Sequence, residues 1–169
     1  MHSNGISAQS FKGAYFVKGS GKEVKDFEDA AKSKTYDKPD SLCTKVVGDG
    51  YTSCDMPACL LVVTGDNDIK AYKKFLKNED KFCRSIPKNE LKRIKADNCD
   101  DWASRIRETI INHMNSYMEI VKENCKFKNT PDTLDAADAL RALDADKFDW
   151  RNGKIKDNKS DYNNSSMRK

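Results

Sequence analysis

The chain has 169 residues, of which 34% are charged and 37% hydrophobic, and its formal net charge is +4. This length suits one domain that buries about two thirds of its unfolded surface. The net charge is too small by itself to indicate a nucleic-acid partner. The longest apolar run, residues 58–63, is far shorter than the roughly 20 residues that span a bilayer, so the sequence predicts no transmembrane segment.

The first part of the chain predicts a flexible arm over residues 1–21, in which "GAYFVKG" (13–19) is typical of a short edge strand. The start, "MHSNGISAQS", is polar and has no signal-peptide pattern, so an exported protein would already have lost its leader. Residues 22–34 predict a short helix with Val24, Phe27 and Ala31 on one side. Pro39 then ends this segment.

Residues 43–63 contain the best strand candidates. The segments "CTKVV" and "CLLVV" are apolar and rich in β-branched residues, and "GDGYTSCDMPA" separates them. The pattern predicts a β-hairpin with a long loop.

Residues 67–82 predict a helix with two opposite faces. The apolar face would hold Ile69, Tyr72, Phe75, Leu76 and Phe82. Lysines at helical spacing follow the other face, namely Lys70, Lys73, Lys74, Lys77 and Lys81. Pro87 then suits the first turn of a short helix whose Leu91 and Ile94 face inward.

The strongest element is the segment 100–125, where apolar residues at helical spacing cover about half of the circumference. We expect this helix to be central to the fold. Thr130 and Pro131 predict the start of another helix over "TPDTLDAADALRALD". Asn152 and Gly153 form the preferred type I′ turn of a second hairpin over 148–156, and residues 157–169 predict a disordered polar tail.

Six cysteines stand in the chain, at Cys43, Cys54, Cys59, Cys83, Cys99 and Cys125. The spacing fits neither paired zinc ligands nor a C-x-x-C redox motif. An even number of cysteines in a chain with a thin core favours three disulfides in an oxidising compartment, and reduced core cysteines are the alternative. A continuous helix places Cys99 and Cys125 about 39 Å apart, which excludes a bond between them. We expect Cys83 to pair with Cys99 and Cys125 to reach the 43–59 hairpin.

The most coherent surface feature is basic. Residues 70–95 carry ten Lys or Arg and three acids, a difference of +7. A solvated helix face explains this pattern, and so does a binding surface for an anionic macromolecule. The aromatic residues Tyr72 and Phe75 fall on the apolar side of the segment and not among the lysines, which argues against nucleic acid as the partner. The candidate binding residues are Lys70, Lys73, Lys74, Lys77, Lys81, Arg84, Lys88, Lys92, Arg93 and Lys95.

His113 lies within the apolar arc of the long helix. It is interpreted as a buried or half-buried structural histidine, and the functional alternative is a general base in a cleft shared with the acids of 131–149. No nucleophile motif, EF-hand loop or nucleotide-binding motif accompanies it, so no catalytic residue, metal or cofactor is predicted.

These patterns together predict a mainly α fold: a compact bundle of four to five helices around the helix 100–125, with a disulfide-tied hairpin over 43–63 and a single domain over 22–156. The favoured function is that of a secreted, extracellular or periplasmic, non-enzymatic protein, its signal peptide removed, that binds another protein or an anionic macromolecule through the basic face. The alternatives are a small hydrolase with a cleft around His113, and an intracellular nucleic-acid-binding module that uses the same basic face.

Overall fold

A four-stranded sheet forms the middle of the molecule. The computed structural model describes residues 13–48, 55–97, 100–129 and 131–156. The sheet contains β1 (Ala14–Ser20), β2 (Cys43–Val47), β3 (Pro57–Val63) and β4 (Asp132–Asp135) in the order β2-β3-β1-β4. β3 is antiparallel to both of its neighbours, and β1 is parallel to β4. The strands at the two edges are therefore β2 and β4.

Alternate residues of the two inner strands enter two separate cores. On β3, Leu61 and Val63 belong to one core, and Leu60 and Val62 belong to the other. Each of these four side chains is completely buried. A strand that is covered on both faces has a continuous apolar run in place of an alternating one, which explains the sequence "CLLVV".

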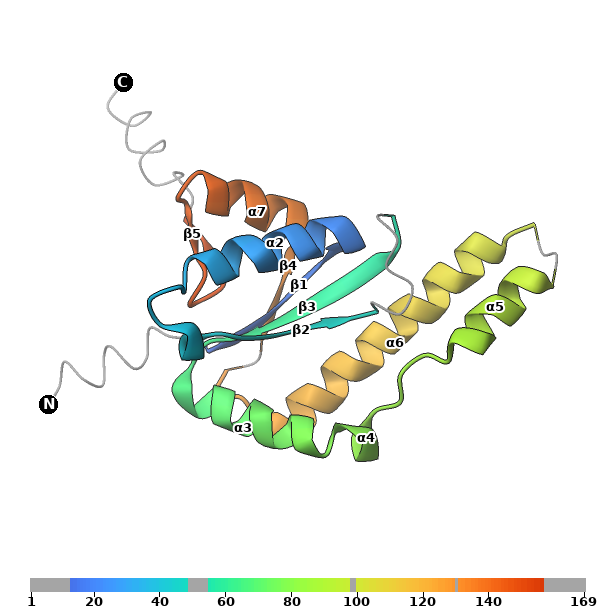
Figure 1. Ribbon diagram of the computed structural model, residues 1–169, viewed down its shortest axis with the longest axis horizontal. Helices are drawn as coiled ribbons and strands as arrows, with labels where there is room; N and C mark the ends of the chain where they lie inside the picture. Colours follow the sequence, from blue (N-terminus) through green and yellow to red (C-terminus); the bar gives the residue numbers. More distant parts are fainter. Residues whose placement is uncertain (1–12, 49–54, 98–99, 130, 157–169) are drawn as a thin grey trace, which may run out of the picture.

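Helices α2 (Gly21–Ser33) and α7 (Ala136–Asp144) cover one face of the sheet (Figure 1). Ser20 and Glu23 form a capping box at the start of α2, and Asp135 caps α7. The core under these helices contains several alanines, among them Ala31 and Ala139. Such small side chains let the two helices and the sheet approach closely.

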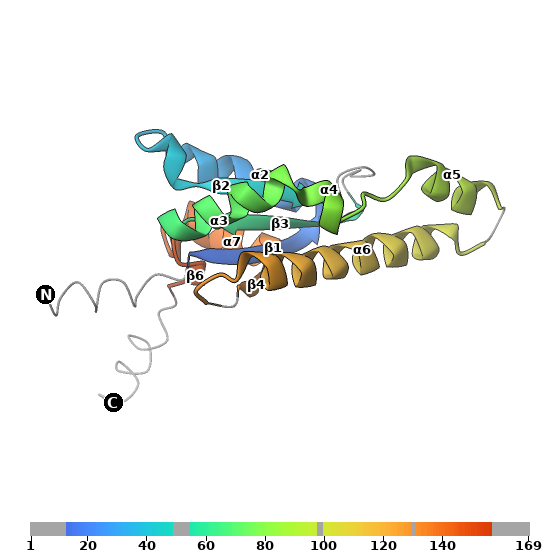
Figure 2. The same ribbon diagram turned by 90° about the horizontal axis from the view of Figure 1, so that it is seen from below.

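Helices α3 (Asp66–Lys77) and α6 (Trp102–Cys125) cover the other face. Two short helices follow α3, namely α4 (Glu79–Phe82) and α5 (Lys88–Ala96). α5 lies against α6 and buries Leu91 and Ile94. The first part of α6 and all of α5 extend beyond the sheet as a two-helix arm (Figure 2).

The predicted mainly α bundle is wrong, because the described residues form a three-layer α/β/α sandwich around a mixed sheet. The long helix covers one face of this sheet and is not the centre of a bundle. Residues 14–20, expected within a flexible arm, form the inner strand β1. The sequence pattern did not reveal this role because the partners of β1 are distant in the chain, at 57–63 and 132–135.

Smaller differences concern the turns and caps. β2 and β3 pair as expected, but as part of the larger sheet. The segment after Pro131 begins with strand β4, and α7 starts only at Ala136. A short 3-10 helix, η1 (Pro39–Ser41), precedes β2. Strands β5 (Phe148–Asp149) and β6 (Lys154–Ile155) form the second hairpin.

The turn of this second hairpin is not the predicted type I′. Type I′ requires a positive φ at both central residues, whereas only Gly153 has one, at 66°. A side chain at Gly153 would also place its Cβ 2.5 Å from the ring of Tyr15. Glycine is therefore required here by both backbone conformation and packing.

Candidate functional site

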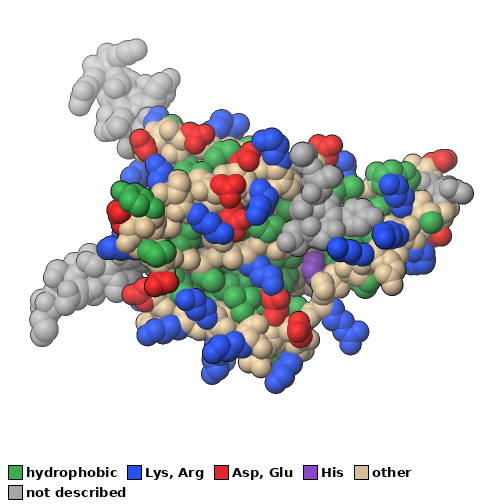
Figure 3. Space-filling model, in the orientation of Figure 1, with side chains coloured by type: hydrophobic (Ala, Val, Ile, Leu, Met, Phe, Trp, Pro, Cys, Tyr) green, Lys and Arg blue, Asp and Glu red, His purple; other side chains and the backbone are tan. Residues whose placement is uncertain are grey.

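The ten predicted basic residues lie on the consecutive helices α3, α4 and α5 and in the connection between the last two. Four stand on α3, one on α4, one in the connection after α4 and four on α5. All ten side chains are exposed. Figure 3 shows basic side chains along α3 and around α5 on the face that it displays.

Burial of the apolar face of α3 explains this exposure. Ile69, Tyr72 and Phe75 are buried in the core under α3, so the lysines between them point to solvent. Phe82, predicted on the same apolar face, is 44% exposed. The reason is a break at Asn78, where α3 ends and α4 begins in a new direction.

Most of these cations make no ion pair with a residue that the structure describes. Arg93 contacts Asp97 at 3.7 Å, and the Lys95 ammonium lies 5.2 Å from the centre of the Trp102 ring. Within the part of the chain that the structure describes, the other eight make no ion pair. Their positive charge is therefore not offset within the described fold.

Next to this face, the edge strand β2 is attached to a helix by a partly buried chain of polar contacts. Lys45 on β2 donates to Glu79 of α4 at 2.5 Å. The Tyr117 hydroxyl of α6 donates to the same carboxylate at 3.0 Å and lies 2.8 Å from the Tyr72 hydroxyl of α3. One chain of contacts thus connects β2, α4, α6 and α3.

The two tyrosines of this chain stay protonated across the ordinary pH range. Burial is the main cause that raises the pKa of Tyr72, and the nearby Glu79 raises it further. Burial likewise raises the pKa of Tyr117, with further contributions from Tyr72 and Glu79. Both hydroxyls therefore remain hydrogen-bond donors and do not act as bases.

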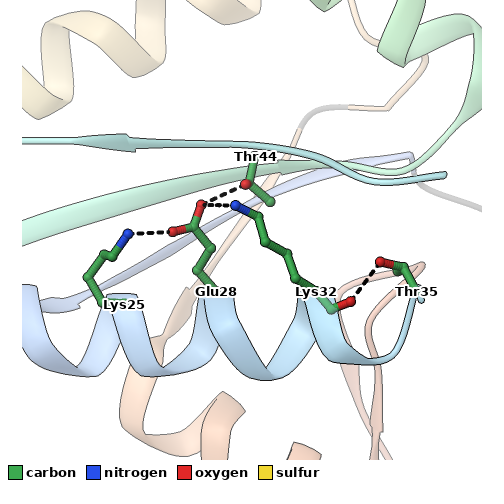
Figure 4. A network of polar contacts seen from close by, with 5 residues as sticks. All are labelled: Lys25, Glu28, Lys32, Thr35 and Thr44. Atoms are coloured by element: carbon green, nitrogen blue, oxygen red, sulfur yellow. Dashed lines mark hydrogen bonds and ion pairs between the residues drawn. The ribbon is translucent and has the colours of Figure 1, made fainter. Parts of the chain in front are cut away.

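A second carboxylate holds β2 from the opposite face (Figure 4). Glu28 of α2 is only 5% exposed. It accepts a hydrogen bond from Thr44 of β2 at 2.6 Å and ion pairs from Lys25 at 2.9 Å and Lys32 at 3.2 Å. Burial alone would raise the pKa of Glu28, but these donors outweigh it and the pKa is lowered. Glu28 is thus charged and fully engaged.

A cleft of about 150 Å³ opens beside β2, and the Lys45–Glu79 pair forms part of its lining. Its lining includes residues 45–48 of β2 and the following turn, Cys83 to Ser85 after α4, and His113 and Tyr117 of α6. His113 is half-buried, and burial lowers its pKa, so it is neutral at pH 7. Burial raises the pKa of the Cys83 thiol, and Glu79 raises it further. The thiol is therefore protonated and a poor nucleophile.

The acids predicted to share a cleft with His113 are elsewhere. Residues 131–149 form β4, α7 and β5, and α7 packs on the other face of the sheet. None of them lines the cleft. Its acids are Glu79 and Asp80, and Glu79 is already occupied by Lys45 and Tyr117. The fold therefore does not bring His113 together with the acids of residues 131–149.

The predicted disulfides are wrong for the cysteines that the structure describes. Cys43, Cys59, Cys83 and Cys125 are free thiols, and all four lie in or against the core under α3 and α6. Cys54 and Cys99 lie outside the described residues, so the structure describes only Cys83 of the predicted Cys83–Cys99 pair. Apolar cores on both faces of the sheet supply the stabilisation that the disulfides were expected to provide. The predictions of secretion and of a removed signal peptide, which depended on disulfides, lose that support.

Sequence reasoning missed Lys45, Glu79 and Tyr117, which form the polar chain beside the cleft. Lys45 interrupts the apolar run of β2, and Glu79 interrupts the basic run 70–84. A lysine within an apolar strand and an acid within a basic segment are a signal that the two form an ion pair, but only the fold shows that they meet. No three His, Cys, Asp or Glu side chains among the described residues are grouped to hold a metal ion.

Comparisons with protein-family models, with curated proteins and with solved structures find no match for this chain. Among the described helices, none has the length and apolar character that crossing a bilayer requires.

Proposed function

We propose that this chain is a non-enzymatic binding protein whose basic face contacts an anionic macromolecule. The basic face consists of the ten exposed cations on α3, α4, the connection after α4 and α5. The observation that carries the proposal is that eight of these ten cations make no ion pair within the described residues.

Charge repulsion supports this reading. Lys70, Lys74 and Lys77 follow one another at spacings of four and three residues on α3, where like charges destabilise an exposed helix by a few tenths of a kcal/mol per pair. An anionic partner removes this repulsion when it binds. The cost in the free protein is small, and it is offset only in a complex.

The type of partner follows from the aromatic residues. Proteins that bind single-stranded nucleic acid usually stack bases on exposed aromatic rings. Tyr72 and Phe75 are buried beneath the lysines, and Phe82, the one exposed aromatic residue of this segment, stacks on the Phe75 ring, so the face offers a single ring with one side covered. The basic face therefore favours an acidic protein or another anionic polymer over single-stranded nucleic acid.

The test compares two triple variants of the full chain with equal changes in charge. One variant replaces Lys73, Lys74 and Lys77 by Glu. The control also introduces three Glu residues, at the positions of Lys147, Lys154 and Lys156, which are exposed at or beside the β5–β6 hairpin. Binding to heparin and to poly-L-glutamate is measured at several salt concentrations. We expect the first variant to lose more than about tenfold in affinity at low salt and the control to lose much less.

An equal loss in both variants would show that only the overall charge matters, and the proposal would fail. Circular dichroism of both variants checks that the fold is retained.

A further inference from the structure

The outer edge of β2 has backbone groups that pair with none of the described residues. β2 is the last strand of the sheet and pairs only with β3 among the described strands. Outside this ladder, the N–H and C=O groups of Cys43–Val47 make no hydrogen bond with any described residue. Alternate residues of an edge strand point these groups outward, where another strand can pair with them.

This edge is held in place from both faces. Thr44 is fixed to Glu28 on one face, and the next residue, Lys45, is fixed to Glu79 on the other. Neither contact uses the backbone of β2. The strand is therefore fixed in position while its outer hydrogen-bonding groups stay available, so little further ordering is needed when a partner strand binds.

Space for a partner lies beside this edge. A cavity of about 240 Å³ is lined by Asp40 just before β2 and by Asp66, Ile69, Lys70 and Lys73 of α3. The 150 Å³ cleft, lined by residues 45–48, lies at the other end of β2. Figure 3 looks onto this side of the molecule and shows hydrophobic side chains between β2 and α3, with basic side chains along α3.

The charge around the edge selects the partner. Lys70 and Lys73 line one hollow together with Asp40 and Asp66, and Arg84 and Lys45 line the other together with Glu79 and Asp80, so the charges in each lining balance. Of the cleft's two acids, Glu79 is neutralised by Lys45. The basic face continues outward from here along α3 and α5. The excess of positive charge lies on this basic face, where Lys74 and Lys77 make no ion pair with a described residue, so a partner segment that reaches α3 from the edge is favoured when it carries acidic side chains.

We infer that an extended acidic segment of a partner protein adds to β2 as a fifth strand of the sheet. This inference rests on the proposed function, and it specifies the partner as a peptide that binds by β-strand addition. Backbone hydrogen bonds to Cys43–Val47 supply the register. The lysines of α3 supply the preference for acidic residues.

The test uses a fluorescein-labelled ten-residue peptide of alternating Glu and Val and the same peptide with N-methyl groups on its central residues. Both peptides have the same charge, but the methylated one lacks the N–H groups that pair in a sheet. Fluorescence anisotropy with the full chain should show at least tenfold weaker binding of the methylated peptide. Hydrogen–deuterium exchange should slow at residues 43–47 when the unmodified peptide binds.

The outcomes separate this inference from the proposed function. Strand addition would be overturned if both peptides bound equally well and if both lost binding to the Lys73→Glu, Lys74→Glu, Lys77→Glu variant. The basic face would then remain as an anion-binding surface. Absence of binding by the unmodified peptide, or protection confined to α3, would overturn strand addition as well. If both triple variants instead bound heparin and poly-L-glutamate as well as the unmodified chain does, the proposed function would be rejected.

A second copy of the chain is the competing occupant, because the opposite edge strand β4 carries Asp132 and Asp135. Sedimentation of the chain alone tests this. A concentration-dependent dimer with slow exchange at both 43–47 and 132–135 would assign the edge to self-association and overturn the peptide inference.

Discussion

The two faces of β2 are held by the same kind of contact in different surroundings. On the α2 face, the Glu28 carboxylate is buried and receives three donors, and it lines neither the 150 Å³ cleft nor the 240 Å³ cavity. On the α4 face, Glu79 receives Lys45 and Tyr117 and borders the 150 Å³ cleft. The comparison separates a closed contact, which serves stability, from an open one beside a binding surface.

The largest expected effect tests whether both layers are true cores. Leu60 and Leu61 are adjacent on β3, completely buried, and belong to opposite cores. Replacing either one by Ala should lower the free energy of unfolding by about 2–5 kcal/mol, measured by urea denaturation. A loss below about 1 kcal/mol for one of them would mean that its layer does not cover the sheet.

An intermediate effect is expected for the open contact on the α4 face. Tyr117→Phe removes the hydroxyl that joins Tyr72 to Glu79, and it leaves the Tyr72 hydroxyl buried without this partner. We expect a loss of about 1–3 kcal/mol. Tyr72→Phe should lower the free energy of unfolding by less, because Tyr117 keeps its bond to Glu79. Equal losses for the two variants in urea denaturation would contradict the placement of Tyr117 between Tyr72 and Glu79.

The smallest effects separate the two carboxylate contacts by pH. The folded state lowers the pKa of Glu28 below its ordinary value near 4.5. Its contribution to stability is therefore present above that value and is lost as the pH falls through the folded pKa. Glu28→Gln should cost about 1–2 kcal/mol at pH 7, and the difference from the unmodified chain should shrink as the pH falls below 4.5 and through the folded pKa.

The matched change on the open side is Lys45→Met. Lys45 is 36% exposed, so this pair should contribute less than about 1 kcal/mol. Urea denaturation at pH 7 and at low and high salt measures both variants. A larger cost for Lys45→Met than for Glu28→Gln would reverse the assignment of closed and open contacts.

Local patterns in the sequence were reliable where a helix or strand is defined by its own residues. The α2 helix buries Val24, Phe27 and Ala31 as its spacing predicts. The spacing of α3 likewise predicts that Ile69 and Phe75 are buried. Helical periodicity records which face is apolar, and the exposure of the lysines follows directly from it.

The candidate site was only half predictable. The basic face follows from the sequence, because its residues lie on consecutive helices. The contact of Lys45 with Glu79 and Tyr117 joins residues separated by 34 or more positions. No short-range pattern carries that information, and the same holds for the contact of Thr44 with Glu28.

The sequence by itself determined the helices, the hairpin of β2 and β3, and the separation of basic and acidic segments. The tertiary structure decided the fold class, because the pairing of β1 with β3 and β4 makes a central sheet from segments far apart in the chain. It also decided the state of the described cysteines. Covering the sheet on both faces buries enough apolar surface for Cys59 and Cys125 to pack as free thiols in the core.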